Sequence, residues 1–220
     1  MVKKIKIYLI VLMMIVCTIL SYFAINITTY AKQAKTTIML DAGHGGYDVG
    51  SIAMDGTYEK NYNLKIVKAL GKMLVEKGYN VVYTRTSDKV SWPDDNTLDL
   101  QARCDLAQNK NADYFISIHL NSSDYNDGAK GYEIYYDYSN KKTKKLSNSI
   151  LKSLDTLNYS TNRGLLDTNE NPLYVITNNT VPALLIETGF ITDSSDLDYI
   201  KNHTKELCEA IVNGIDTSLS

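Results

Sequence analysis

The sequence predicts an α/β fold with a mostly parallel sheet flanked by helices. After Ala31, segments with strand-like and helix-like patterns alternate along the chain, which is typical of a parallel sheet. Several of the apolar strand segments lack polar alternation, as expected when helices cover both faces of the sheet. The chain has 220 residues, of which 44% are hydrophobic and 22% charged. It therefore has room for one ordinary globular domain and a short appendage.

The first 31 residues differ from the rest of the chain. Three lysines within the first six residues precede an uncharged, mostly apolar stretch from Ile7 to Ala31. The hydrophobic part of a signal peptide runs about 7–15 residues, and a membrane-spanning helix needs about 20. We expect residues 1–31 to be a signal peptide or an uncleaved signal anchor helix, with the lysines in the cytoplasm. Residues 32–35 are then a linker and residues 36–220 the catalytic domain, located outside the cytoplasm.

The elements of this domain follow from local patterns. The first strand is expected over Thr36–Leu40, a β-branched run that ends at a glycine-rich turn. The first helix opens near Glu59, carries an apolar stripe and ends at Gly78, the residue type favoured after a helix C-terminus. The other expected elements are strands at Tyr79–Thr84, Tyr114–Ile118, Gly131–Tyr136, Leu173–Ile176 and Ala183–Ile186, and helices at Leu98–Gln108, Leu146–Leu157 and His203–Ile215.

Polar residues stand where several of these strands end. His44 follows the first strand, His119 directly follows Tyr114–Ile118, and Glu187 directly follows Ala183–Ile186. Glu59 opens the helix that returns from the same end of the first strand. In open α/β sheets, ligands bind at the carboxyl ends of the strands. We therefore expect these four side chains to meet at one edge of the sheet.

Two histidines and two carboxylates suit metal-assisted hydrolysis. Two imidazoles and one carboxylate hold Zn²⁺ with a fourth position open, and a second carboxylate can move protons. Each residue also has a simpler interpretation. A single histidine after a strand is often structural, and Glu59 is an acid of the kind favoured in the first turn of a helix. Glu187 is harder to explain without a function, because burying an unpaired acid at the end of an apolar strand is costly.

The segments that carry these residues resemble the zinc-dependent N-acetylmuramoyl-L-alanine amidase family of the amidase-3 type. The resemblance rests on four motifs in the family's order, and Arg85, Asp88 and Arg103 also match family positions. The motifs are LDAGHGG at Leu40–Gly46, EKN at Glu59–Asn61, ISIHLN at Ile116–Asn121 and LIETGF at Leu185–Phe190. The resemblance implies a twisted, mostly parallel sheet of about six strands.

The resemblance also implies a set of roles and a substrate. His44, Glu59 and His119 would be the zinc ligands and Glu187 the catalytic acid and base. The bond cut would be the amide between N-acetylmuramic acid and L-alanine in peptidoglycan. Asn121 is a candidate to orient substrate. A leader followed by a bare catalytic domain is similar to the amidases that prepare spore cortex for germination, although cell wall remodelling and lysis also use such domains.

The partners follow from the same features. Peptidoglycan is the expected substrate, the N-terminal segment is expected to contact the cytoplasmic membrane, and targeting could also come from an activator protein. No basic tract stands out, which argues against a nucleic acid partner. Two alternatives stay open on the residues alone. One is a zinc peptidase acting on bonds within the stem peptide, and the other is a non-catalytic, membrane-tethered wall-binding module.

Overall fold

The computed structural model describes residues 12–21, 36–123 and 127–220. The chain divides into two units, Met1–Lys35 and Thr36–Ser220. In the first unit, residues 12–21 are helical, and the rest of the expected signal or anchor segment lies outside the described residues. Within the described parts of the chain, no helix is both long enough and apolar enough to cross a membrane.

The second unit contains one six-stranded sheet in the order β2-β1-β3-β6-β4-β5. The four strands β2, β1, β3 and β6 run parallel to one another, whereas β4 is antiparallel to β6 and β5 is parallel to β4. The first residues of β4 and β5 therefore lie at the same edge as the carboxyl ends of the other strands. The strands are β1 Thr37–Ala42, β2 Asn80–Tyr83, β3 Tyr114–Asn121, β4 Tyr132–Tyr136, β5 Asn162–Asp167 and β6 Ala183–Phe190.

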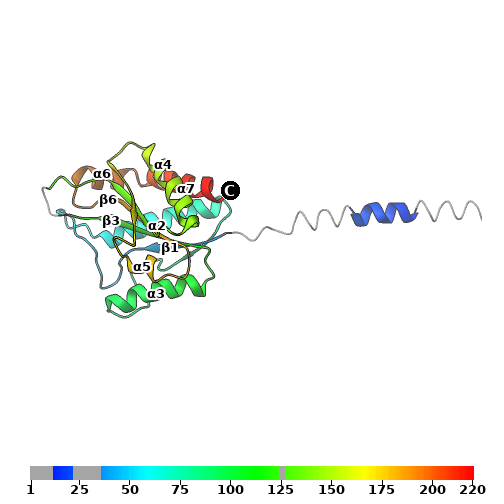
Figure 1. Ribbon diagram of the computed structural model, residues 1–220, viewed down its shortest axis with the longest axis horizontal. Coiled ribbons are helices and arrows are strands. Elements are labelled where there is room, and N and C mark those ends of the chain that lie inside the picture. The colour runs from blue at the N-terminus through cyan, green and yellow to red at the C-terminus, as the bar shows by residue number, and fades with distance from the viewer. Residues whose placement is uncertain (1–11, 22–35, 124–126) are drawn as a thin grey trace, which may run out of the picture. The chain divides into compact units, whose positions relative to one another are not determined.

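Helices cover the two faces of this sheet unequally. On one face lie the three longest, α2, α4 and α7, and on the other lie α3 and the short α5 (Figure 1). This leaves part of the second face open at the carboxyl edge. The helices are α2 Glu59–Glu76, α3 Asn96–Asn109, α4 Lys141–Asp155, α5 Tyr174–Thr177, α6 Ser194–Asn202 and α7 Thr204–Leu219.

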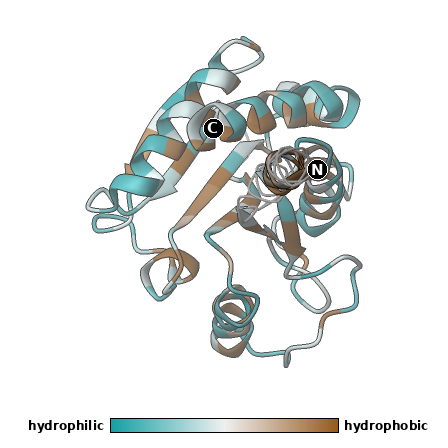
Figure 2. Cartoon of the chain, turned by 90° about the vertical axis from the view of Figure 1, so that its right-hand side faces the viewer, coloured by the Kyte–Doolittle hydropathy of each residue, from teal (hydrophilic) through white to brown (hydrophobic). Residues whose placement is uncertain are grey.

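The strands are the apolar centre of the unit because both of their faces are covered. Figure 2 shows them mainly in the hydrophobic colour, with hydrophilic surfaces on the outer sides of the helices. Successive residues of β1 alternate between two cores: Ile38 and Leu40 pack in the larger core under α2, α4 and α7, while Met39 packs in the smaller core with α3 and α5. Asp41 comes two residues after Met39 and points to the same face of the sheet, so β1 places a buried carboxylate on the side of the smaller core just before the strand ends.

One expected element differs from the structure, and two elements of the structure were not expected. The strand expected at Leu173–Ile176 is wrong, because Tyr174–Thr177 form the helical turn α5 against the smaller core. Its aromatic and β-branched residues favour a strand locally, but packing decides so short a segment. The sixth strand is instead β5, Asn162–Asp167, whose glycine and polar ends hide the strand pattern. The helix α6 was also not expected.

Candidate metal centre and catalytic site

His44 lies on the loop that follows β1, in a backbone conformation that few side chains adopt. Its φ is 61°, in the left-handed region, and Gly45 and Gly46 after it also have positive φ. The Nδ1 of His44 lies 2.7 Å from Oδ2 of Asp48. This carboxylate orients the ring and leaves Nε2 facing Glu59. Carboxylates that bind the outer nitrogen of a metal-binding histidine orient its ring in the same way.

Glu59 is the first residue of α2 and is only 2% exposed. Four nitrogen atoms lie within 3.1 Å of its Oε1: His44 Nε2, His119 Nδ1, Asn63 Nδ2 and the Leu120 backbone nitrogen. Its Oε2 accepts a further bond from the Ser51 backbone. Burial by itself would raise the pKa of Glu59, but the two histidines overcome this effect and hold that pKa well below its usual range.

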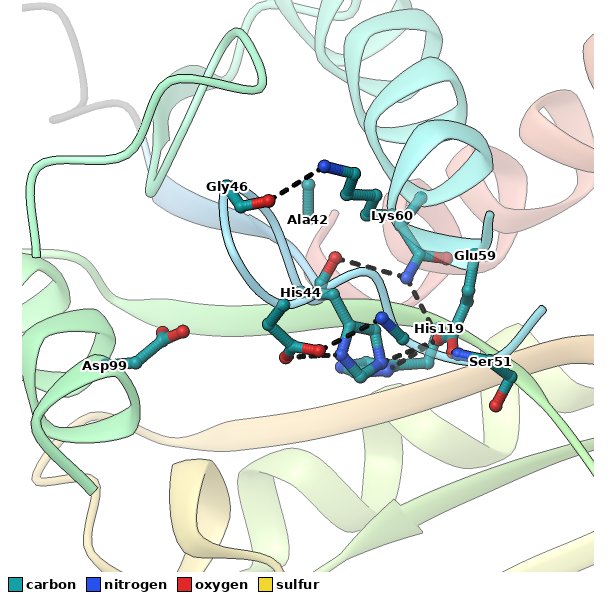
Figure 3. Close-up of polar contacts among 12 residues, drawn as sticks. Ala42, His44, Gly46, Ser51, Glu59, Lys60, Asp99 and His119 are labelled. Carbon is teal, nitrogen blue, oxygen red and sulfur yellow. Dashed lines mark hydrogen bonds and ion pairs between the residues drawn. The ribbon is translucent and has the colours of Figure 1, made fainter. Parts of the chain in front are cut away.

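The three side chains fit a metal ion. One ligand atom from each of His44, Glu59 and His119 lies within 4.8 Å of the others, and Figure 3 shows the three gathered at the edge of the sheet. Four nitrogens around one carboxylate oxygen exceed its two lone pairs, and a cation between the imidazoles and the carboxylate would relieve this crowding. Two nitrogens and one oxygen are also a donor set that zinc accepts.

Two glycines make room for these candidate ligands. A Cβ on Gly43 would lie 2.2 Å from Nε2 of His119, and a Cβ on Gly50 would lie 2.6 Å from the His44 ring and 2.7 Å from Oε2 of Glu59. Any larger residue at either position would push a ligand away. The glycine-rich sequence around His44 is therefore a requirement of close packing at the site.

Buried cations hold the loop between β1 and His44. Arg103 donates to the backbone oxygens of Ala42 and His44, and it forms ion pairs with Asp41 at 2.7 Å and Asp99 at 2.6 Å. Arg85 donates to the oxygens of Ala42 and Gly43. Burial tends to raise the pKa of Asp41, but Arg103 and two hydroxyl donors keep it lowered.

Lys60, which follows Glu59 in α2, also holds the loop that carries His44. Its Nζ donates to the Gly46 oxygen at 2.8 Å, as Figure 3 shows, and to Asp88 at 2.7 Å. The other oxygen of Asp88 accepts from the Gly46 nitrogen. Asp88, Arg85 and Arg103 are the three residues that the sequence resemblance singled out, and all three contact the loop that carries His44.

Glu187 lies on β6 at the same edge, paired in register with His119 of the neighbouring strand β3. Paired residues on adjacent strands point to the same face, so both face the side of the sheet that α3 and α5 leave open. The side chain of Glu187 is partly exposed, but its Oε2 is buried and has no hydrogen-bond partner among the described residues. Burial, together with the negative charges of Glu59 and Glu133, raises the pKa of Glu187 well above its usual value.

Glu133 is an acid at this edge that the sequence interpretation missed. It lies on β4 directly opposite Glu187 and is 2% exposed. Its Oε1 accepts from Asn121 at 2.7 Å and from the Tyr135 hydroxyl at 2.9 Å, and its Oε2 accepts from Arg163 at 2.7 Å. An acid inside the aromatic and apolar strand YEIYY was a signal that could have identified it. Asp48, the partner of His44, was missed as well.

Asn121 reaches the edge as expected, but its side chain is already engaged. Its amide nitrogen binds Glu133 and its Oδ1 accepts from the Ser122 backbone. The four residues expected to meet, His44, Glu59, His119 and Glu187, do lie together at one edge. Next to the histidines is a cavity of about 370 Å³, bounded by α3 and by the segment before α5. It opens onto the two histidines and is lined by apolar residues such as Leu100 and Leu173.

Comparisons with known proteins agree with this geometry. The sequence profile described as N-acetylmuramoyl-L-alanine amidase matches residues 38–217. The amidase LytC of Bacillus subtilis (strain 168) is 34% identical over 196 residues, which are 85% of this chain but only 37% of LytC.

Two solved amidase structures share the fold over nearly their whole length. The N-acetylmuramoyl-L-alanine amidase of Clostridium difficile 630 superposes with a TM-score of 0.75 at 32% identity, covering 85% of this chain and 98% of that one. The CwlD amidase of Clostridioides difficile, solved in complex with the GerS lipoprotein, gives 0.76 at 30% identity, covering 84% and 98%. The chain belongs to the N-acetylmuramoyl-L-alanine amidase family, whose members hydrolyse the amide bond between N-acetylmuramic acid and L-alanine in peptidoglycan.

Proposed function

We propose that this chain performs the amide hydrolysis of its family with zinc held by His44, Glu59 and His119 and with Glu187 as the proton carrier. The observation that carries the proposal is the position of Glu187. Its Oε2 is buried and unpaired at the same edge as the three ligand atoms, one strand from His119. A buried acid without a partner costs stability, which is expected where the group serves a reaction.

The two carboxylates divide the work. Glu59 is held ionised by its histidine neighbours, as a metal ligand must be. Glu187 has a raised pKa, so it can accept a proton from the attacking water and return it. Zinc supplies a Lewis acid that polarises the scissile carbonyl and lowers the pKa of a water to about 7.

The remaining residues position these groups. Asp48 holds the His44 ring so that Nε2 faces Glu59. Arg103 and Arg85 fix the carbonyls of the loop before and at His44. At the leaving nitrogen of L-alanine, Glu187 delivers the proton that it took from water, so the peptide departs as a neutral amine.

The experiment that tests the bond specificity is product analysis on purified peptidoglycan treated with the full chain. Peptides released with a free L-alanine N-terminus, together with glycan strands that keep an intact muramic acid, support the proposal. New N-termini inside the stem peptide would instead support the zinc peptidase. Binding to peptidoglycan without any release, with and without chelator, would support the wall-binding module.

We further propose an extracytoplasmic location, because peptidoglycan lies outside the cytoplasmic membrane and the first residues resemble a signal or anchor segment. A protein partner is also part of the proposal, since CwlD has been solved in complex with the GerS lipoprotein. Full hydrolysis of peptidoglycan by the purified chain alone would contradict the need for such a partner. A role in spore cortex processing stays a prediction.

A further inference from the structure

Arg163 occupies an irregular position on the edge strand β5. In the pairing with β4, Tyr132 lies opposite Asn162 and Glu133 lies opposite Gly164, so Arg163 is the extra residue of a β-bulge. In a regular strand, the residue before Gly164 would face away from Glu133. The bulge turns the Arg163 side chain towards Glu133, and bulges often re-aim a side chain in this way beside active sites.

The contacts of Arg163 hold its chain in place but leave its tip available. Its Nε donates to Oε2 of Glu133 at 2.7 Å, and its guanidinium carbon lies 5.0 Å from the centre of the Phe190 ring. A Cβ on Gly131 would lie 3.0 Å from the Arg163 stem, so a glycine there lets the stem lie close to the backbone. The side chain is 40% exposed, and the hydrogen bonds found among the described residues use only Nε. Its two terminal nitrogens remain for a ligand.

Arg163 also lies in line with the catalytic groups. From β3 through β6 and β4 to β5, the edge of the sheet presents His119, Glu187, Glu133 and Arg163 in that order. Adjacent strands are about 4.8 Å apart, so β5 lies roughly 10 Å beyond Glu187 on β6. The side chain of Arg163 points from β5 back to Glu133 on the neighbouring strand β4.

The direction of the substrate follows from the chemistry. The leaving nitrogen lies beside Glu187, which protonates it, and the edge continues from Glu187 through Glu133 to Arg163. A departing peptide that follows the edge away from the zinc ligands therefore extends towards β4 and β5. An extended peptide advances about 3.5 Å per residue. Because the Arg163 side chain reaches back to Glu133, one strand spacing or about 5 Å from Glu187, the group that it meets belongs to the residue after L-alanine. In the stem peptide this residue is a γ-linked glutamate, whose α-carboxyl is free in acidic stems and a carboxamide in amidated stems.

We propose that Arg163 binds this α-carboxylate and makes the enzyme selective for acidic over amidated stem peptides. The inference rests on the proposed function and adds a specificity determinant to it. A guanidinium can bind a carboxylate through two parallel N–H donors. In Arg163, the bond from Nε to Glu133 orients the two terminal nitrogens that would make this bidentate contact. Glu133 is thus a positioning residue, because it acts through Arg163 and does not touch the carboxylate.

The test compares two soluble muramoyl peptides that differ only in this group, the free acid and the amide. The full chain loaded with zinc should cleave the acid with a kcat/KM on the order of ten- to hundredfold higher, as expected for a hydrogen-bonded ion pair. R163Q should reduce this ratio to about one. R163K should retain part of it, because lysine keeps the positive charge but cannot make the bidentate contact. Any general effect of R163Q through Glu133 acts on both substrates and cancels in the ratio.

Lys130 provides the matched control. It is an exposed cation next to Gly131, near the same edge, and none of the described hydrogen bonds joins it to Glu133. K130Q removes the same charge and should leave the ratio of the two kcat/KM values within about twofold of the parent value. If K130Q lowers the ratio as much as R163Q does, the selectivity is a general electrostatic effect and the proposal is overturned. A wild-type chain that cleaves both peptides equally, or an R163Q variant that keeps the parent ratio, would also overturn it. Cleavage of neither peptide at the muramoyl–alanine bond would refute the proposed function and this inference with it.

Discussion

Glu133 and Glu187 lie directly opposite each other on the antiparallel strands β4 and β6. Residues that pair across adjacent strands point to the same face of the sheet, so both carboxylates lie on one face beside the catalytic edge. Glu133 is stabilised by Asn121, Tyr135 and Arg163, whereas Oε2 of Glu187 has no partner in the described part of the chain. The fold thus fixes one acid in a network of donors and leaves one oxygen of the other acid without a donor among the described residues.

The first prediction concerns the pH dependence of stability. The pKa of Glu187 is raised in the folded protein, so the carboxylate form destabilises the fold. Below about pH 4, the side chain is neutral in both the folded and the unfolded state, and its effect on stability vanishes. As pH rises through the folded pKa, the wild type loses stability that E187Q keeps.

Thermal unfolding of the metal-free proteins measures this effect. E187Q should melt several degrees higher than the wild type at pH 8 and at nearly the same temperature at pH 4, since 1 kcal/mol moves the Tm of a domain of this size by about 2–4 °C. Equal melting temperatures at pH 8 would show that Glu187 is not strained by burial.

The second prediction concerns the clearance around His119. In G43A, the new methyl group would lie 2.2 Å from Nε2 of His119, so the ring must move. Zinc affinity should fall at least tenfold, as measured by competition with a chromogenic chelator. G78A is the control, because nothing lies within 4 Å of its Cβ although its φ of +98° strains the backbone. An equal loss of affinity in G78A would assign the effect to general destabilisation.

The third prediction concerns Arg103, the buried cation that holds the loop carrying His44. R103M leaves Asp41 and Asp99 as buried carboxylates without their cation, which should lower the free energy of unfolding by about 3–5 kcal/mol. Chemical denaturation of the metal-free protein measures the loss. K77M removes an exposed ion pair with Asp216 and should cost less than about 1 kcal/mol. A similar cost for both variants would contradict the role of burial.

The fourth prediction concerns metal removal. Zinc that binds only the folded protein adds about 2.7 kcal/mol at a free concentration of 100 times its Kd, so a chelator should lower the Tm by roughly 5–10 °C. H119A should show no shift with zinc or chelator. H203A alters an exposed histidine at the start of α7 and should keep the full shift. A zinc-dependent shift in H119A would remove this histidine from the ligand set.

Much of the site could be predicted from the sequence because it depends on topology. Histidine or glutamate directly after an apolar strand, as at His119 and Glu187, must lie near the carboxyl edge of a parallel sheet. The position of Glu59 follows from the helix that returns from that edge. These expectations need only the order of the elements, which hydrophobic periodicity indicates well.

The missed features depend on packing that no local pattern encodes. The segment Tyr174–Thr177 has the residues of a strand but forms a turn of helix over the smaller core. The strand β5 contains Gly164 and begins with a bulge at Arg163, so it lacks alternation. Because β5 was missed, the partnership of Arg163 with Glu133 could not be foreseen.

The role of Glu187 is tested most directly by the zinc content and the hydrolysis rate of E187Q, compared with those of the wild type on purified peptidoglycan. We expect one zinc per chain in both proteins and a fall of about a thousandfold in the release of L-alanine N-termini by E187Q, since general acid–base catalysis typically contributes about 10²–10⁴-fold. Hydrolysis by zinc-loaded E187Q at a rate near that of the wild type would contradict the assignment of Glu187 as the proton carrier.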